Sequence, residues 1–133
     1  NSNEDLLQHT LLQHTNTRGA GSSWLQLFKK MAIDSHTDFR QISFDDSNLV
    51  IQAAEHGHGV AFERHSFVAD KINGQSLERP LNIGLHSEYQ YYLITDPDHV
   101  ESAPVKNVLT WLNKESKEFI LGNQSALRQI NWL

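Results

Sequence analysis

Two groups of polar side chains in this sequence have the residue types that bind small charged molecules. Asp45, Asp46 and Ser47 follow one segment with the pattern of a short strand, and Glu63, Arg64 and His65 follow another. Carboxylates and hydroxyls accept or donate hydrogen bonds, and an arginine fork can hold a carboxylate or phosphate through two parallel bonds. The two groups therefore predict a ligand-binding edge, provided that the fold brings them together.

The elements beside these groups are predicted to be strands and helices in alternation. Residues 41–44 alternate in polarity and lead into acids, as a strand that ends at a turn does. A helix is expected to start near Ser47, because Asp45, Asp46 or Ser47 can cap it, and to close at Gly57. Residues 60–62 form a short apolar run typical of a buried parallel strand.

The rest of the chain continues the alternation. The pattern predicts strands at 11–14, 77–81 and 89–95, and helices from Ser22 or Ser23, over about 65–72, and from Pro104 to just before Gly122. Strands separated by helices indicate an α/β fold with a parallel or mixed sheet and helices on its faces.

An α/β sheet binds ligands beyond the carboxyl ends of its strands, so the loops 14–18, 45–48 and 63–66 are expected to share one rim. Arg18 and Arg64 would provide cationic groups there. A structural interpretation stays open beside this one: the polar residues cap helices, and Arg64 pairs with Glu63 or Asp45. Both interpretations can hold together.

Composition excludes several classes of protein. The 133 residues allow one modest core, and 11 basic against 16 acidic side chains give a formal charge of −5 with no basic patch for DNA. The chain has no cysteine, which fits a reducing cytosol. It also has no run of about 18 apolar residues and no targeting segment at its start, so we expect a cytoplasmic protein without membrane contact.

Metal and catalytic motifs are weak. His56 and His58 lie near Glu55 and His65, but no cysteine or second carboxylate completes a metal-ligand set. Ser66 lies in no Gly-x-Ser-x-Gly turn of the kind that exposes a nucleophile. The sequence therefore predicts no metal, no cofactor and no enzyme activity.

The order of motifs resembles the effector-binding domain of LysR-type transcriptional regulators, in the branch typified by the glycine cleavage activator. The resemblance covers about residues 5 to 118. It is carried by Phe44-Asp45, Ala53-Ala54, the run Gly57-x-Gly59-Val60-Ala61, and Arg64, with further matches at Leu6-Leu7, Trp24-Leu25, Tyr91-Tyr92 and Trp111-Leu112.

The resemblance implies a periplasmic-binding-protein-like domain of two α/β lobes, with a small-molecule effector in the cleft between them. Residues 1–88 would be the second lobe, and 89–133 the returning strand, C-terminal helix and tail of the first lobe. Most of the first lobe and the DNA-binding winged helix-turn-helix would be missing. The effector-binding positions implied are Asp45, Asp46, Ser47, Glu63, Arg64, His65 and Tyr92.

Glu63 departs from the small residue expected at its position, which disfavours an anionic effector unless Arg64 neutralises it. The family also implies a homodimer or higher homo-oligomer, for which the chain offers an apolar face at Val105, Leu109, Leu112, Phe119 and Ile120. Two alternatives remain: a small α/β enzyme that uses His65, Glu63 and Arg64, and a lobe of a periplasmic solute-binding protein.

Overall fold

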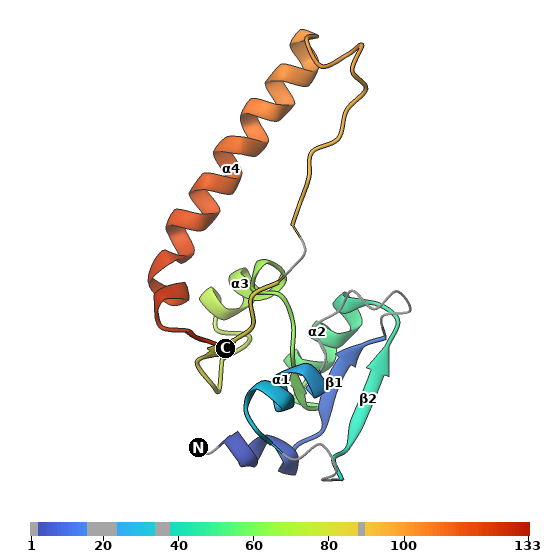
Figure 1. Ribbon diagram of the computed structural model, residues 1–133, viewed down its shortest axis with the longest axis vertical. Coiled ribbons are helices and arrows are strands. Elements are labelled where there is room, and N and C mark those ends of the chain that lie inside the picture. Colours follow the sequence, from blue (N-terminus) through green and yellow to red (C-terminus); the bar gives the residue numbers. More distant parts are fainter. Residues whose placement is uncertain (1–2, 16–23, 34–37, 88–89) are drawn as a thin grey trace. The chain divides into compact units, whose positions relative to one another are not determined.

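The computed structural model describes residues 3–15, 24–33, 38–87 and 90–133 (Figure 1). The chain forms two compact units. The first comprises Asn1–Ser87 together with Asn131–Leu133, and the second comprises Glu88–Ile130. Each unit is described by itself.

A three-stranded parallel sheet forms the centre of the first unit. Strands β1 (Leu11–His14), β2 (Gln41–Phe44) and β3 (Val60–Ala61) have the order β2-β1-β3. Leu11 pairs with Gln41 on one side and with Val60 on the other. All three strands run in the same direction, so the predicted parallel sheet is confirmed for residues 11–14, 41–44 and 60–61.

The central strand β1 has apolar side chains on both faces, which is why helices cover both. Leu11 and Leu12 are fully buried and, as successive strand residues, point to opposite faces. Leu11 packs in a cluster with Leu6, Trp24, Leu27 and Phe28, which come from the 3₁₀ helix η1 (Asn3–Gln8) and the helix α1 (Trp24–Lys30). Leu12 packs with Val50 and Ala53 of the helix α2 (Ser47–Glu55).

Helix α2 has the ends that its sequence predicts. The Asp46 carboxylate accepts a hydrogen bond from the Asn48 backbone N–H at 2.7 Å, so Asp46 is the N-cap. After Glu55 the chain turns at Gly57, which has a φ of 73°. Such a left-handed conformation carries little cost for glycine alone. The turn sends the chain back toward β3.

Helix α3 (His65–Asn73) is fastened to the end of α2 by an ion pair. Both carboxylate oxygens of Glu55 lie 2.8 Å from Lys71 Nζ, and the Ser76 hydroxyl donates to the same carboxylate at 2.8 Å. These hydrogen bonds, from Lys71 first and Ser76 second, lower the pKa of Glu55. Glu55 therefore has a structural partner on α3.

Two of the predicted strands are wrong. Residues 77–81 form no strand, and the pairing occurs two residues later, where β4 (Ile83–Gly84) lies parallel to β5 (Asn131–Trp132). Pro80 lacks the N–H that a strand would donate. Residues 90–95 also form no strand, and Tyr92 there is 76% exposed. A strand needs a partner for its backbone, and β-propensity alone does not provide one.

The C-terminal strand β5 ties the end of the chain into the first unit. The Asn131 N–H donates to the Asn82 carbonyl at 2.7 Å, and the Leu133 N–H donates to the Gly84 carbonyl at 3.0 Å. Trp132 stacks on His86 with ring centroids 4.6 Å apart, and Leu133 packs against the Leu11 cluster. This return of the chain was not predicted from the sequence.

The second unit contains the long helix α4 (Ala103–Arg128). Pro104 lies in its first turn, as predicted, and the structure adds Ser102 as its N-cap. The predicted end before Gly122 is wrong, because α4 continues to Arg128. One glycine costs a helix only about 1 kcal/mol, which a helix of this length tolerates.

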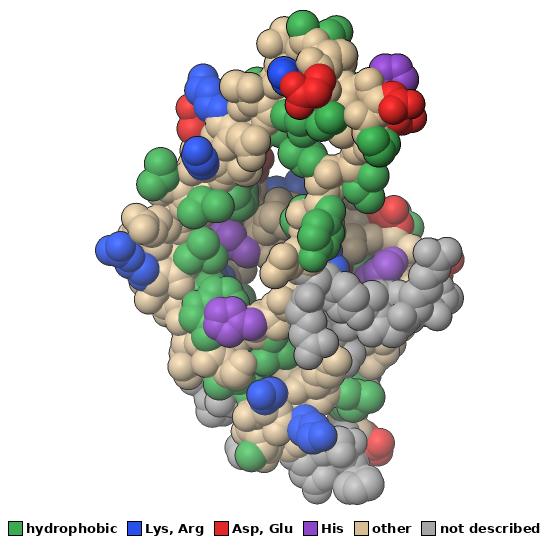
Figure 2. Space-filling view, turned by 45° about the horizontal axis from the view of Figure 1, so that its top comes forward, with side chains coloured by type: hydrophobic (Ala, Val, Ile, Leu, Met, Phe, Trp, Pro, Cys, Tyr) green, Lys and Arg blue, Asp and Glu red, His purple; other side chains and the backbone are tan. Residues whose placement is uncertain are grey.

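Large hydrophobic side chains are uncovered along α4: Val108, Trp111, Ile120 and Leu121 are each more than half exposed. The space-filling view shows hydrophobic side chains open at the surface among charged ones (Figure 2). No helix in the described part of the chain is both long enough and apolar enough to cross a membrane.

Candidate functional site

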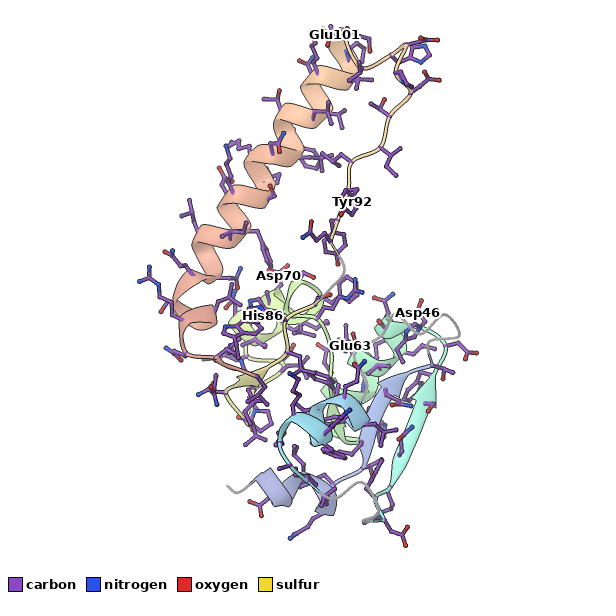
Figure 3. The ribbon with its side chains drawn as sticks, viewed as in Figure 1. Asp46, Glu63, Asp70, His86, Tyr92 and Glu101 are labelled. Carbon is purple, nitrogen blue, oxygen red and sulfur yellow. The ribbon has the colours of Figure 1, made fainter. Side chains whose placement is uncertain are left out.

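The three parallel strands of the first unit end at one edge, and polar side chains gather there. The Thr15 N–H donates to the Phe44 carbonyl at 2.6 Å, and His14 Nε2 lies 2.9 Å from the Asp45 carbonyl oxygen. These contacts join the end of β1 to the end of β2. Asp46 and Glu63 both lie toward this end of the sheet (Figure 3).

The third strand end is joined to the same edge through Glu63. The Ser47 side chain, at the start of α2, and the backbone N–H of Arg64 lie near enough to the Glu63 carboxylate to lower its pKa. Electrostatic interactions with His14 and Arg64 also lower the pKa of Glu63. We call His14, Asp45, Ser47, Glu63 and Arg64 the carboxyl-end cluster.

Glu63 is in an unusual state for a carboxyl group. Its Oε1 atom is buried and has no hydrogen-bond partner in the described part of the chain. Burial raises the pKa of Glu63, and the interactions with Ser47 and Arg64 and the nearby charges only partly oppose this shift. A buried oxygen without a donor costs roughly 1–3 kcal/mol. The cluster therefore keeps an acceptor that the fold does not use.

We predict that Glu63→Gln makes the protein more stable at neutral pH. A carboxyl whose pKa is raised by folding binds its proton more tightly in the folded state, so stability falls as the pH rises from the unfolded value of 4.5 through the raised value. The amide stays neutral and avoids this loss. Melting temperatures of parent and variant between pH 4 and pH 8 test the prediction: the variant's advantage should shrink below pH 4.5. The prediction is refuted if the melting temperature of the variant minus that of the parent is lower at pH 7 than at pH 4.

The other predicted site residues have separate positions. Asp46 is exposed and caps α2, which supports the structural interpretation for this residue. Arg64 is the N-cap of α3 without a side-chain capping bond, and its guanidinium carbon lies 6.0 Å from the centre of the Phe67 ring. His65 begins α3 and is partly buried. Tyr92 belongs to the second unit, and Arg18 lies outside the described residues.

His14 was included in a predicted loop but not among the predicted binding residues. His14 ends the central strand of the sheet, and ligands of α/β proteins bind beyond such strand ends. This position was the signal that could have identified His14 as a site residue. In the described residues, no three histidine, aspartate or glutamate side chains are arranged to hold a metal ion. The imidazole nitrogen Nδ1 of His56 lies 2.7 Å from the Gln52 carbonyl oxygen, within its own helix end.

Comparison with known proteins identifies the family. Residues 2–117 match the family model described as the LysR substrate binding domain. The chain is 29% identical over 110 residues to the glycine cleavage system transcriptional activator of Escherichia coli K12, covering 82% of this chain and 34% of that protein. It is 34% identical over 77 residues to the HTH-type transcriptional activator AmpR of Pseudomonas aeruginosa, covering 57% of this chain and 25% of that protein.

The fold agrees with these sequence matches. The X-ray structure of the effector domain of Pseudomonas aeruginosa AmpR superposes with a TM-score of 0.61 at 23% identity, covering 93% of this chain and 58% of that chain. The predicted α/β, periplasmic-binding-protein-like class is confirmed. This chain spans about a third of the length of the glycine cleavage activator that it matches. It belongs to the LysR substrate binding domain family, the effector-binding part of LysR-type transcriptional regulators.

Proposed function

We propose that this chain supplies one wall of a small-molecule effector site, through which a LysR-type regulator controls its binding to DNA. The observation that carries the proposal is the carboxyl-end cluster, in which the ends of three parallel strands bring the Ser47 hydroxyl, the Glu63 carboxyl group and the Arg64 guanidinium to one edge of the sheet. Such convergent polar groups at the strand ends of an α/β sheet are the usual place for a ligand.

The role proposed is recognition without catalysis. The relatives are named as transcriptional activators, and one is named as an HTH-type protein. The formal charge of −5 in this chain disfavours DNA contact by the chain itself. We therefore assign DNA binding to a helix-turn-helix segment of the whole regulator, and effector recognition to the cluster around Glu63 and Arg64.

The effector proposal predicts that Arg64→Ala removes ligand binding while the fold survives. A charge-assisted hydrogen bond is worth about 1.5–3 kcal/mol, so we expect affinity to fall roughly tenfold or more. The intact gene product is screened by thermal shift against small organic acids, amines and amino acids, and any compound that raises the melting temperature is titrated against parent and variant. Arg40→Ala is the matched control, because Arg40 is exposed and lies at the opposite end of β2.

Equal affinity in the parent, the Arg64 variant and the Arg40 variant would contradict a site at the carboxyl-end cluster. A loss of affinity in both variants would point to a general charge effect on the chain, and would also count against it.

We further propose that the regulator associates as a symmetric pair through α4. Val108 and Ile120 remain exposed on this helix, on the face that also carries Val105, Leu109 and Leu112, and two-fold pairing is the commonest way to cover such a face. Ile120→Glu should dissociate the pair, because a charge would be buried in an apolar contact, whereas Asn107→Glu, at an exposed position on the other side of α4, should not. Light scattering of this chain decides the point: a single species of 15.2 kDa at high micromolar concentration would refute the pair.

A further inference from the structure

The tail of the chain, residues Asn131–Leu133, docks on the first unit as an added strand beside β4. Two backbone hydrogen bonds of 2.7 and 3.0 Å hold it, together with the stack of Trp132 on His86 and the packing of Leu133 against the Leu11 cluster. Extended segments that join a sheet edge in this way take affinity from backbone bonds and selectivity from side-chain contacts. The surface beside β4 is therefore a docking site for a segment with the sequence of the tail.

The chain that connects β4 to the tail within one copy is short for the distance that it must cover. Helix α4 has 26 residues, which at 1.5 Å per residue make a rod of about 39 Å. Eleven residues, 85–95, lead from β4 to Asp96. The His99 N–H then donates to the Asp96 carbonyl and the Ser102 N–H to the His99 carbonyl, so the turn before α4 is compact and adds little length. Residues 85–95, which we call the linker, reach about 36–40 Å at full extension. For the tail to return to β4 of its own copy, the linker must be drawn out almost completely.

The described end of the linker is extended in this way. Residues 90–95 form neither helix nor strand and run as a drawn-out trace (Figure 1). Leu93 and Ile94 there are 55% and 92% exposed. A flexible chain of eleven residues has an end-to-end distance of only about 20 Å, roughly half of what the return of the tail requires. Stretching a linker so far beyond its relaxed length lowers the effective concentration of the segment that it tethers. Docking of the tail on another copy of the chain can therefore compete with docking on its own copy.

We infer that two copies of this chain exchange their tails, so that the tail of each copy pairs with β4 of the other. This inference rests on the pair through α4 proposed above and adds a second contact to it. The exchange keeps every contact of the tail, because β4, His86 and the Leu11 cluster are the same in both copies. It relaxes both linkers, and it places both α4 helices between the same two first units, where their apolar faces can cover each other. The tail lies outside residues 2–117, which match the family model, so the exchange is a property of this chain.

Single cysteines report the exchange directly, because the chain has none of its own. Ile83 and Asn131 are Cα partners on neighbouring strands, which lie about 4.8 Å apart, a separation that a disulfide can bridge. Ile83→Cys and Asn131→Cys are made in separate chains, mixed at high micromolar concentration and oxidised. Any disulfide between these two positions then joins two copies, and mass spectrometry of the non-reduced digest measures its yield. Gly84→Cys with Trp132→Cys, the other pair in register, replaces them if Ile83→Cys loses the circular dichroism spectrum of the parent.

Gln41→Cys mixed with Asn131→Cys is the matched control for chance collisions, because Gln41 is exposed in the first unit but belongs to the other sheet. We expect the disulfide between positions 83 and 131 to form in roughly tenfold higher yield than the control disulfide.

Two further variants test the cause of the exchange. An insertion of about ten Gly and Ser residues after Thr95 should lower the yield of the disulfide between copies several-fold, because a longer linker lets the tail return to its own copy without being stretched. Ile120→Glu should lower the yield as well, through loss of the pair.

Three results would overturn the inference. The first is a yield no higher than that of the control while light scattering shows a pair, a result that leaves the proposed pair through α4 standing. The second is an undiminished yield after the insertion in the linker. The third is the absence of any disulfide in the double variant Ile83→Cys/Asn131→Cys, because the tail would then not pair with β4 at all. A single species of 15.2 kDa in light scattering would remove the pair and the exchange together.

Discussion

Replacement of Gly59 by alanine is expected to destabilise the first unit by about 3 kcal/mol or more. A Cβ atom on Gly59 would lie 2.2 Å from the Thr10 carbonyl oxygen and 3.0 Å from the Thr10 carbonyl carbon. The same oxygen accepts the Val60 N–H at 2.9 Å, which is the bond that aligns β3 with β1. The obstacle is backbone of the central strand, so no side-chain rotation can relieve it. Urea denaturation followed by far-ultraviolet circular dichroism measures the loss.

Two other glycines serve as controls for this prediction. A Cβ atom on Gly122 meets nothing within 4 Å, and this residue lies inside α4, so Gly122→Ala should be neutral or stabilising by up to about 1 kcal/mol. Gly57→Ala should have an intermediate cost of about 1–2 kcal/mol, from the left-handed backbone alone. The close approach of β3 to β1 would be refuted if Gly59→Ala cost no more than Gly57→Ala.

Phe28→Ala should cost about 3–5 kcal/mol of folding free energy, the range for removing a fully buried aromatic ring. Phe28 is 0% exposed and contacts two other rings, Phe39 at 5.4 Å and Trp24 at 5.9 Å between centroids. Its loss leaves a cavity on the η1 and α1 face of the sheet.

The matched substitution in the same helix is Leu25→Ala. Leu25 is 55% exposed, so its removal should change stability by about 0.5 kcal/mol or less. Both are measured from the midpoint and slope of urea denaturation. Similar midpoints for the two variants would mean that α1 does not cover the sheet through Phe28.

The parts of the fold that the sequence predicted are those specified by neighbouring residues. Asp46 before Ser47, the apolar spacing of Val50 and Ala53, and Gly57 after the helix are local signals, and α2 has the expected bounds. The parallel order of β1, β2 and β3 follows from the helices that connect them. The general rule for ligands in α/β sheets then brought Asp45, Ser47 and Glu63 to one edge.

The errors concern contacts between residues far apart in the chain. Strand β4 pairs with β5 across nearly fifty positions, and two-residue strands carry almost no periodic signal. Tyr91 and Tyr92 have strong β-propensity but belong to none of the strands in the described residues. The state of Glu63 was equally unreadable, because the burial of one carboxylate oxygen depends on the three-dimensional packing around it. The sequence indicated only that an acid was unexpected there.

Because β5 pairs with β4 in the first unit, the segment from Glu88 to Ile130 is attached to that unit at both of its ends. One attachment is covalent, at Ser87. At the other end, residues Asn131–Leu133 are held in the first unit by non-covalent contacts: the two-residue pairing of β5 with β4, the stack of Trp132 on His86 and the packing of Leu133 against the Leu11 cluster. Short pairings of this kind open at lower free energy than a central sheet. Helix α4 can therefore be released at its C-terminal end without loss of the β1–β3 sheet, so the pairing of β5 with β4 can open while the carboxyl-end cluster stays intact.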